Sequence, residues 1–249
     1  MSEEKVIGII PARYESTRFP GKPLAKIKDR TMIEWVVDAA VAAREIDEVY
    51  VATDDRRIVE VVEKTAAKAI MTPAGLSTGS DRVAVVARQK EAEIIVNIQG
   101  DEPLIRGTDL DRGIRALRRH PSLGVASFKA PCPPAEFENP DVVKVVTDAE
   151  NRSLYFSRSP VPFLRGEETG VYQHVGIYIY RKEALFSFMR CEPTPLEKAE
   201  KLEQLRILEN GGQILMVDLD YPTVGVDRPE DIKEVEDRLT AGFEEDDLR

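Results

Sequence analysis

The chain has few of the residues on which several common kinds of protein site depend. Its 249 residues include two cysteines, two histidines and one tryptophan. Cys132 and Cys191 lie far apart and lack the close spacing of metal ligands, which is typical of reduced thiols in the cytoplasm. One of the histidines, His120, lies in a polar Arg-Arg-His-Pro segment. We therefore expect neither Ser-His-Asp nor Cys-His catalysis.

Long apolar runs are also missing. No segment approaches the roughly 20 apolar residues that a membrane-spanning helix needs, and the start, Met-Ser-Glu-Glu-Lys, has no apolar core of a signal peptide. The formal net charge is −10, which argues against non-specific binding to nucleic acid or to an anionic membrane surface. We expect a cytoplasmic protein with no nucleic-acid or membrane partner.

Short apolar runs alternate with helical patterns through much of the chain. The runs predict strands at Val6–Ile10, Val49–Ala52, Ile94–Ile98, Gly124–Phe128 and Ile214–Val217. Apolar residues spaced three and four apart predict helices over Thr31–Arg44, Arg56–Lys68 and Asp81–Lys90. Strands that alternate with helices predict an α/β, Rossmann-like fold with a mainly parallel central sheet and helices on both faces.

The middle of the chain departs from this alternation. The segments Val142–Thr147 and Ser153–Ser157 flank a turn-like Asp-Ala-Glu-Asn tetrad, which predicts an antiparallel hairpin. The segment His174–Tyr180 alternates loosely, like a further strand. We therefore expect a single domain over residues 1–249 that carries an inserted antiparallel lobe at about residues 131–192.

Two more helices are expected after this lobe. Thr194, Pro195 and Glu197 have the pattern of a helix N-terminus, with a capping threonine, a first-turn proline and a glutamate three residues on. They predict one long helix that ends at Asn210-Gly211-Gly212. A closing helix is predicted over Pro229–Leu239.

The first predicted strand runs directly into a basic loop. Residues 9–24 read IIPARYESTRFPGKPL and hold three cations, Arg13, Arg18 and Lys22. Ligands of open α/β sheets bind at the carboxyl ends of strands, and three cations there suit a triphosphate whose leaving pyrophosphate needs its charge neutralised. The string is not a Walker P-loop, because the pattern Gly-x-x-x-x-Gly-Lys-Ser/Thr is missing. A solvated basic loop is the simpler alternative for any one of these cations.

Two aspartates follow glycine-containing strand ends. Asp101 occurs in Gln-Gly-Asp and Asp227 in Gly-Val-Asp. On local sequence alone, Asp101 also suits an ordinary turn, and Asp227 also suits the N-cap of the helix at Pro229. Asp54 is expected to start the helix that follows it and is left outside the site.

The basic string resembles the signature of sugar-activating nucleotidyltransferases. Its Arg-Phe-Pro-Gly-Lys-Pro-Leu form resembles the 3-deoxy-manno-octulosonate (KDO) cytidylyltransferase family in particular. Further blocks of that family follow in the same order, from about residue 5 to 238: ATDD at 52–55, VNIQGDEP at 96–103, VKVV at 143–146, YFSR at 155–158, HVGIY at 174–178, LEQLR at 202–206 and GVDRPED at 225–231. On these blocks the chain is identified as a member of the family.

The resemblance implies a reaction, a cofactor and an assembly. The family transfers CMP from CTP to the anomeric hydroxyl of KDO, which gives CMP-KDO and pyrophosphate for lipopolysaccharide synthesis. It implies a homodimer and a Mg²⁺ ion on Asp101 and Asp227, with Arg13 and Lys22 on the phosphates. Magnesium fills its octahedron with phosphate oxygens and water, so two aspartates suffice.

The resemblance also implies two sets of binding residues. The nucleotide-binding residues are Pro11, Ala12, Arg13, Lys22, Thr78, Gly79, Ser80, Arg82, Gln99 and Gly100. The sugar-binding residues are Arg158, His174, Tyr178, Glu203 and Gln204. KDO carries a carboxylate and many hydroxyls, so its pocket needs a cation and several hydrogen-bonding groups.

One position departs from the pattern. The family commonly has His-x-Ser-Gly-Thr-Asp/Glu-Arg, whereas this chain has Leu76 in place of the histidine. The change leaves open the same reaction on the 8-amino analogue of KDO, although a position that tolerates change is the simpler explanation. Two more distant alternatives are a non-catalytic CTP- or sugar-binding regulator and a glycosyltransferase. For the glycosyltransferase, Asp218-Leu219-Asp220 supplies the letters of an Asp-x-Asp metal motif outside the matched blocks.

Overall fold

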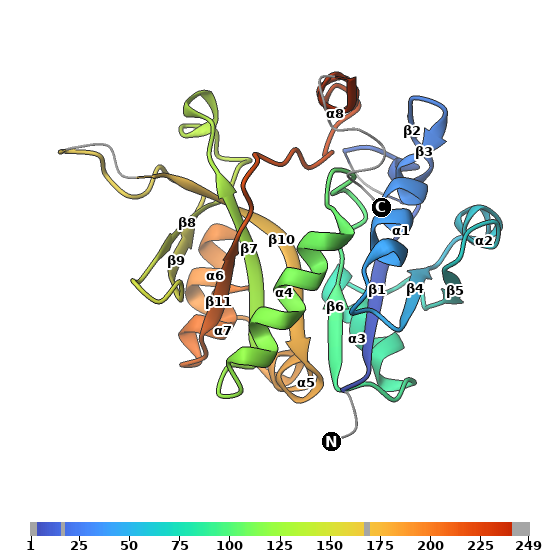
Figure 1. Ribbon diagram of the computed structural model, residues 1–249, viewed down its shortest axis with the longest axis horizontal. Coiled ribbons are helices and arrows are strands. Elements are labelled where there is room, and N and C mark those ends of the chain that lie inside the picture. The colour runs from blue at the N-terminus through green and yellow to red at the C-terminus, as the bar shows by residue number, and fades with distance from the viewer. Residues whose placement is uncertain (1–3, 16–17, 167–169, 241–249) are drawn as a thin grey trace. The chain divides into compact units, whose positions relative to one another are not determined.

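The computed structural model describes residues 4–15, 18–166 and 170–240, which fall into two units (Figure 1). Unit 1 comprises residues 1–112 and 223–249, and unit 2 comprises residues 113–222. The lobe predicted at about residues 131–192 lies within unit 2. No helix in the described ranges is long and apolar enough to cross a membrane.

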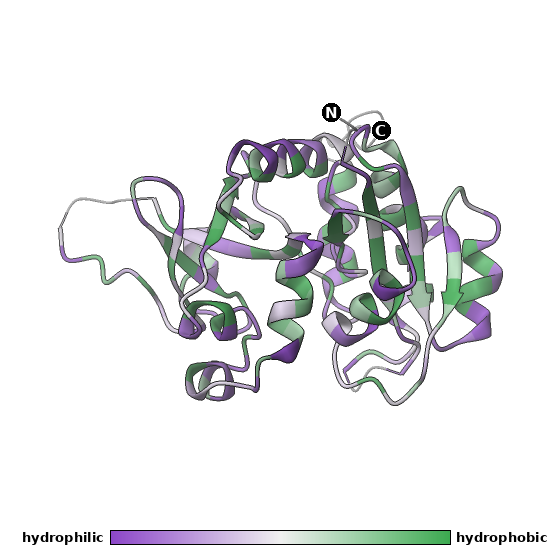
Figure 2. Cartoon of the chain, turned by 90° about the horizontal axis from the view of Figure 1, so that it is seen from below, coloured by the Kyte–Doolittle hydropathy of each residue, from purple (hydrophilic) through white to green (hydrophobic). Residues whose placement is uncertain are grey.

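Four strands of unit 1 pair in parallel, while β2 (Lys26–Ile27) and β3 (Arg30–Thr31) form a separate antiparallel pair. Strand β1 (Val6–Ala12) pairs with β4 (Glu48–Thr53) on one side and with β6 (Ile94–Asn97) on the other, and β4 pairs with β5 (Lys68–Met71). Six of the seven residues of β1 are buried, as expected for a central parallel strand that is covered on both faces. The strands of this unit are largely hydrophobic (green) in Figure 2.

Helices connect these parallel strands. Helix α1 (Met32–Ala42) lies between β1 and β4, α2 (Arg56–Val62) between β4 and β5, and α3 (Gly79–Arg88) between β5 and β6. Because β6 and β4 lie on opposite sides of β1, right-handed crossovers put α3 on one face of the sheet and α1 and α2 on the other. The predicted α/β class, with helices on both faces of a parallel sheet, is confirmed. The remaining elements of unit 1 are η1 (Lys22–Leu24) and α8 (Asp231–Thr240), while α4 (Gly107–Arg119) contains the unit boundary.

Unit 2 is built around strand β7 (Val125–Pro131). It pairs parallel with β11 (Ile214–Asp218) and antiparallel with β10 (Tyr172–Arg181). Strands β8 (Lys144–Thr147) and β9 (Ser153–Ser157) form the predicted antiparallel hairpin, and β8 also pairs with the start of β10. The other elements are η2 (Pro134–Glu136), α5 (Lys182–Arg190), α6 (Pro195–Glu200) and α7 (Leu205–Glu209).

The long helix predicted from Thr194 is wrong. Its start is as expected, because Thr194 and Glu197 form a capping box. The helix then ends at Lys201, which takes a left-handed conformation with φ of 57°, and a separate short helix follows. The leucine spacing was misleading in the first half, because Leu196 is 42% exposed and Glu197 is the buried residue of α6, while Leu205 and Ile207 are buried in α7.

Other element boundaries also differ from the sequence prediction. The helix predicted over Arg56–Lys68 ends at Val62, and Lys68 instead begins β5. None of the four residues of β5 is fully buried, so its apolar signal is weak. Helices α4 and α5 were not predicted. The helix predicted to start at Asp54 begins at Arg56 with Asp55 as its N-cap.

Candidate functional site

A cavity of ≈ 390 Å³ lies in unit 1, past the carboxyl ends of β1 and β6. Its volume falls within the roughly 300–1,000 Å³ of small-molecule sites. The lining combines the basic loop after β1, the start of α3, the turn after β6 and one residue from near the C-terminus. These residues are Pro11, Ala12, Arg13, Arg18, Lys22, Pro23, Leu76, Thr78, Gly79, Arg82, Gln99, Gly100, Asp101 and Asp227.

The cavity brings together the predicted nucleotide-binding residues apart from Ser80. Ser80 is 8% exposed and is one of the buried residues of α3. Close approach of the chain at the cavity floor depends on Gly100, where an added Cβ would lie 3.2 Å from the carbonyl oxygen of Pro11. The segments after β1 and β6 therefore meet closely enough to share one ligand.

The ammonium group of Lys22 lies between the two predicted metal ligands. Lys22 Nζ donates to Asp101 Oδ2 at 2.6 Å and to Asp227 Oδ1 at 3.5 Å, and also to the carbonyl oxygen of Val226 at 2.9 Å. The other carboxylate oxygen of Asp227, Oδ2, forms an ion pair with Arg18 Nη2 at 3.0 Å. Two carboxylates held this close need a cation between them, because their mutual repulsion is otherwise uncompensated.

The core of unit 1 holds Asp227 in this place. Its neighbour Val226 is fully buried in a cluster with residues of α1 and α8, among them Trp35 and Val235. The N–H of Val226 donates to the carbonyl oxygen of Asp101 at 2.9 Å. Asp227 does not cap α8, because that helix begins at Asp231 and the carboxylate oxygens of Asp227 bind Lys22 and Arg18. The alternative role of Asp227 as a helix cap is therefore wrong.

The donor set at Lys22 suits a divalent cation that also binds phosphate. One cation already reaches carboxylate oxygens of both Asp101 and Asp227, whose side chains are 31% and 41% exposed. No group of three or more His, Cys, Asp or Glu that could hold a metal ion occurs among the described residues. A Mg²⁺ ion here would take two protein carboxylates and complete its shell with phosphate oxygens and water, which is its usual mode of binding.

Glu102 is a third carboxyl group beside this pair, and the sequence analysis did not assign it to the site. Its Oε2 atom is buried without a hydrogen-bond partner in the described structure. Burial, together with the charge of Asp101, raises the pKa of Glu102 to about 8, although Lys22 opposes the shift. Glu102 is thus mostly protonated at neutral pH and adds little negative charge. The Gly-Asp-Glu-Pro block was the available sequence signal.

The start of α3 offers backbone N–H groups to the cavity. Thr78 is the N-cap, and its hydroxyl accepts from Asp81 N at 3.1 Å and donates to Asp81 Oδ2 at 3.2 Å. Because this hydroxyl is already engaged, an anion at this end would bind mainly to backbone N–H groups at the start of the helix, beginning with that of Gly79, which lines the cavity.

Arg82 lines the cavity, and its guanidinium group is held by two residues that are not part of the lining. Its side chain is 3% exposed, donates to Asp54 Oδ2 at 2.7 Å and also donates to Thr72 Oγ1. This pairing explains why Asp54 does not start α2. It leaves Arg82 as a buried support of the cavity wall, with its charge partly neutralised.

Four of the five predicted sugar-binding residues come together in unit 2. His174 Nε2 lies 2.9 Å from Ser127 Oγ, and His174 Nδ1 lies 3.4 Å from Gln204 Nε2. The ring of Tyr178 lies 5.5 Å from that of His174, and the charge of Glu203 contributes to the raised pKa of Tyr178. His174 and Tyr178 both lie on β10, whose pairing with β7 is irregular between Val175 and Tyr178.

His174 is a neutral hydrogen-bonding group. Burial lowers its pKa to about 3. Ser127 Oγ donates to the carbonyl oxygen of Ile177 at 2.8 Å, so Nε2–H of His174 is assigned as the donor to Ser127. Nδ1 is then the acceptor for the amide of Gln204. An imidazole in this state has both ring nitrogens engaged and offers no positive charge to a carboxylate.

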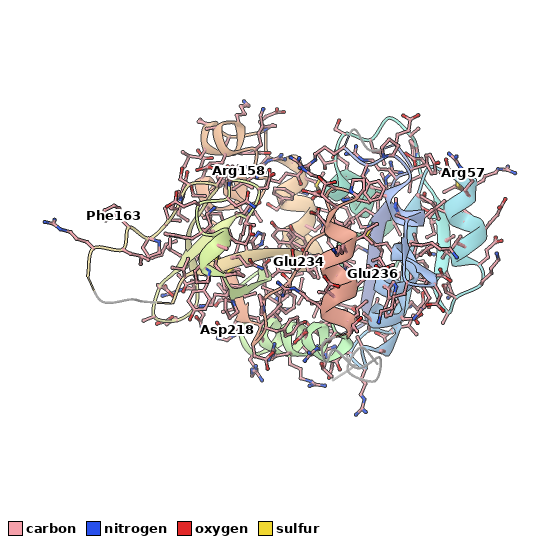
Figure 3. All side chains as sticks on the ribbon, turned by 90° about the horizontal axis from the view of Figure 1, so that it is seen from above. Arg57, Arg158, Phe163, Asp218, Glu234 and Glu236 are labelled. Carbon is pink, nitrogen blue, oxygen red and sulfur yellow. The ribbon has the colours of Figure 1, made fainter. Side chains whose placement is uncertain are left out.

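Arg158 has different partners from the other four. Its Nε donates to the carbonyl oxygen of Glu200 in α6 at 2.8 Å, and its Nη1 donates to that of Pro140 at 2.9 Å (Figure 3). These contacts hold the end of β9 against α6 without neutralising the guanidinium charge, because backbone carbonyls are uncharged. Arg158 remains the cation of the predicted sugar set.

The Asp-x-Asp sequence at residues 218–220 does not form part of the cavity. Asp218 lies at the end of β11 in unit 2 and pairs with the buried ammonium of Lys129 at 3.4 Å (Figure 3). Lys129 also donates to Asn151 Oδ1 at 2.9 Å and faces the ring of Tyr172 at 4.2 Å. Asp218 thus has a structural partner, and the glycosyltransferase alternative loses the motif on which it depended.

Known proteins match this chain over most of its length. A family model described as cytidylyltransferase matches residues 7–216. A protein from Geobacter metallireducens named 3-deoxy-manno-octulosonate cytidylyltransferase is 45% identical, over 95% of this chain and 98% of its own length. A protein of the same name from Solibacter usitatus is 44% identical, over 93% of each chain.

Solved structures are similar to the fold as well. A structure of CMP:2-keto-3-deoxy-manno-octonic acid synthetase complexed with CTP has a TM-score of 0.90 and 39% identity, with 95% of this chain and 99% of that chain covered. A cytidylyltransferase from Leptospira borgpetersenii has a TM-score of 0.65 at 18% identity, covering 96% of this chain and 87% of that chain. The second is a similarity of fold alone.

The raised pKa of Glu102 predicts a specific dependence of stability on pH. The pKa is 4.5 for an ordinary glutamate and about 8 here, so the folded state binds more protons between these values. The free energy of unfolding should therefore fall as pH rises from about 5 to 8, by at most about 1.4 kcal/mol per pH unit. Glu102→Gln should remove this contribution, and Glu60→Gln, at an exposed position on α2, should not. Urea unfolding without divalent metal at pH 5.5, 7.0 and 8.5 measures it, and parallel profiles for wild type and Glu102→Gln would contradict the assignment.

Proposed function

Because the chain belongs to the 3-deoxy-manno-octulosonate cytidylyltransferase family, we propose that it transfers CMP from CTP to the anomeric hydroxyl of KDO. The products are CMP-KDO and pyrophosphate, and the reaction serves lipopolysaccharide synthesis in the cytoplasm. The observation that carries this function is the cavity of unit 1, where Arg13, Arg18 and Lys22 face Asp101 and Asp227. A triphosphate is a ligand that needs both the cations and a metal-binding carboxylate pair.

The chemistry is an in-line substitution at phosphorus. The anomeric oxygen of KDO forms a bond to the α-phosphorus of CTP while the bond from that phosphorus to the bridging oxygen of pyrophosphate breaks. Catalysis comes mainly from holding the two substrates in line and from neutralising the charge that develops on the leaving group. Arg13 and Lys22 have the charge and the position on the cavity wall for the second task.

Lys22 has to change partners to take part. An ammonium group has three donor hydrogens, and Lys22 directs its own toward Asp101, Asp227 and the carbonyl oxygen of Val226. To bind a phosphate oxygen it must leave at least one carboxylate. Asp101 and Asp227 would hold Mg²⁺, which supplies neutralisation of the triphosphate when bound. A cation would therefore neutralise the two carboxylates in both states, Lys22 before CTP binds and Mg²⁺ afterwards.

The sugar is proposed to bind in unit 2. Tyr178, Glu203 and Gln204 offer hydrogen bonds to the hydroxyl groups of KDO, and Arg158 offers a charge to its carboxylate. Neutral His174 would have to exchange Ser127 or Gln204 for a sugar hydroxyl. The division of labour is supported by the pKa of His174, about 3, which leaves Arg158 as the cation of the set at neutral pH. A pyranose with several hydroxyls suits such a mixture of donors and acceptors.

The first prediction concerns the carboxylate pair. Asp101→Asn or Asp227→Asn should lower turnover at least about 100-fold, because each removes a charged metal ligand and a partner of Lys22. Pyrophosphate release on mixing CTP, Mg²⁺ and KDO measures turnover, and the same assay tests the proposed function. Asp220→Asn, at an exposed position in unit 2, should behave like wild type. Near-normal turnover in both site variants would overturn the metal assignment, and a wild type inactive in this assay would favour the binding-regulator alternative.

The second prediction concerns Leu76. It lines the cavity together with Thr78 and Gly79, which are predicted nucleotide-binding residues. Leu76→His should therefore change the KM for CTP more than the choice of sugar. We expect KDO to be the preferred acceptor, and the ratio of kcat/KM for KDO and 8-amino-KDO to change by less than about threefold. Measuring both sugars with both proteins decides this, and a wild-type preference for the amino sugar would assign the other acceptor.

A third prediction concerns assembly. We propose a homodimer that covers exposed apolar side chains of unit 2, namely Leu154, Phe163 and Leu164, which are 62%, 86% and 40% exposed (Figure 3). Phe163 and Leu164 are adjacent in the chain, and contiguous exposed apolar residues commonly mark interaction surfaces. Sedimentation velocity should give twice the chain mass of 27.9 kDa for wild type and a shift toward the monomer for Phe163→Asp. Leu196→Ser, at an exposed position on α6, is the control. A monomeric wild type at micromolar concentration would contradict the dimer.

A further inference from the structure

Tyr14 closes the basic loop onto itself. Its carbonyl oxygen accepts the N–H of Gly21 at 2.8 Å. Gly21 has φ of +74°, a conformation that favours glycine, and a Cβ there would lie 3.2 Å from the Cζ and hydroxyl oxygen of Tyr14. Tyr14 follows Arg13 directly, and Gly21 precedes Lys22. One contact therefore joins the two residues proposed to bind phosphate.

Arg57 covers the ring of Tyr14 from the first turn of α2. Its guanidinium carbon lies 3.3 Å from the centroid of the ring. The guanidinium is held in place by a bidentate pair with Asp55, at 2.9 Å from Nε and 2.6 Å from Nη2. Asp55 is in turn the N-cap of α2, since it accepts from Arg57 N at 2.9 Å. Figure 3 labels Arg57 on this helix.

These contacts form a chain from the sheet to the phosphate-binding residues. Asp55 is fixed by the end of β4 and the start of α2, it orients Arg57, and Arg57 stacks on Tyr14. An arginine held by a bidentate carboxylate has lost most of its freedom before it stacks, so the contact with the ring costs little further entropy. The loop is thereby attached to the end of β4 in the parallel sheet of unit 1.

We propose that Tyr14 and Arg57 are positioning residues that hold the basic loop in its CTP-binding conformation before CTP arrives. This rests on the proposed function. Arg57 is not among the residues that line the cavity, and its Nε and Nη2 are engaged by Asp55, so it acts through Tyr14 and not as a phosphate ligand. A loop ordered in advance binds more tightly, because its ordering entropy is not lost on binding.

Hydrogen exchange tests the structural half of this proposal without any substrate. Arg57→Ala and Tyr14→Ala should each speed the exchange of the peptide covering residues 13–22 in the free protein, because the Gly21 N–H loses its protection. Saturating CTP should remove most of the difference. Tyr14→Phe keeps the ring face and should exchange like wild type. Arg56→Ala removes the neighbouring exposed arginine of α2 and is the matched control.

Kinetics tests the functional half. Arg57→Ala should raise the KM for CTP about two- to fivefold, the range for an exposed cation–π contact, and leave kcat within twofold and the KM for KDO unchanged. Arg57→Lys, which keeps the charge but not the planar stack, should fall between Arg57→Ala and wild type. The double variant Tyr14→Ala/Arg57→Ala should be no weaker in CTP binding than Tyr14→Ala alone, because both remove one contact.

The outcomes separate the two proposals. Faster exchange in Arg57→Ala with an inactive wild type would retain the positioning role and refute the proposed function. Active protein with unchanged exchange and unchanged KM for CTP in Arg57→Ala would refute the positioning role and retain the function. A fall in kcat with unaltered KM for CTP would also refute it, since that result assigns Arg57 to a later step.

Discussion

The site depends on one electrostatic arrangement, the ammonium group of Lys22 between Asp101 and Asp227. The three residues come from a loop after β1, a turn after β6 and a segment before α8, which are far apart in the sequence. The distances of 2.6 and 3.5 Å make the lysine the internal counter-ion of the carboxylates. Without a cation at this point, the turn after β6 and the segment before α8 would repel one another, because one carries Asp101 and the other Asp227.

Hydrophobic packing fixes the position of Asp227 beside Lys22. Val226 is fully buried and bonded through its N–H to Asp101, so Asp227 is held by the core and not by its own charge. Glu102 lies beside the pair and avoids a third negative charge because burial raises its pKa to about 8. The site is thus kept close to electrical balance by a fixed backbone, a shared lysine and a protonated carboxyl group.

Unit 2 uses the opposite strategy. His174 is neutral, with a pKa of about 3, and its two ring nitrogens meet Ser127 and Gln204. Both nitrogens therefore have neutral partners, and the imidazole carries no charge. Charge compensation dominates the cavity of unit 1, whereas neutral hydrogen bonds hold the cluster around His174 in unit 2.

The sequence alone determined the α/β class, the hairpin at β8 and β9, the basic loop, and the choice of Asp101 and Asp227 as the acidic residues of the site. Those features depend on local periodicity, turn residues or matched motifs, which are all written within short segments. Only the tertiary structure decided that Lys22 bridges Asp101 and Asp227, that Ser80 lies outside the cavity, that Asp54 pairs with Arg82, and that the helix from Thr194 breaks at Lys201. Each of these depends on residues distant in the chain or on one backbone angle, and a local pattern contains neither.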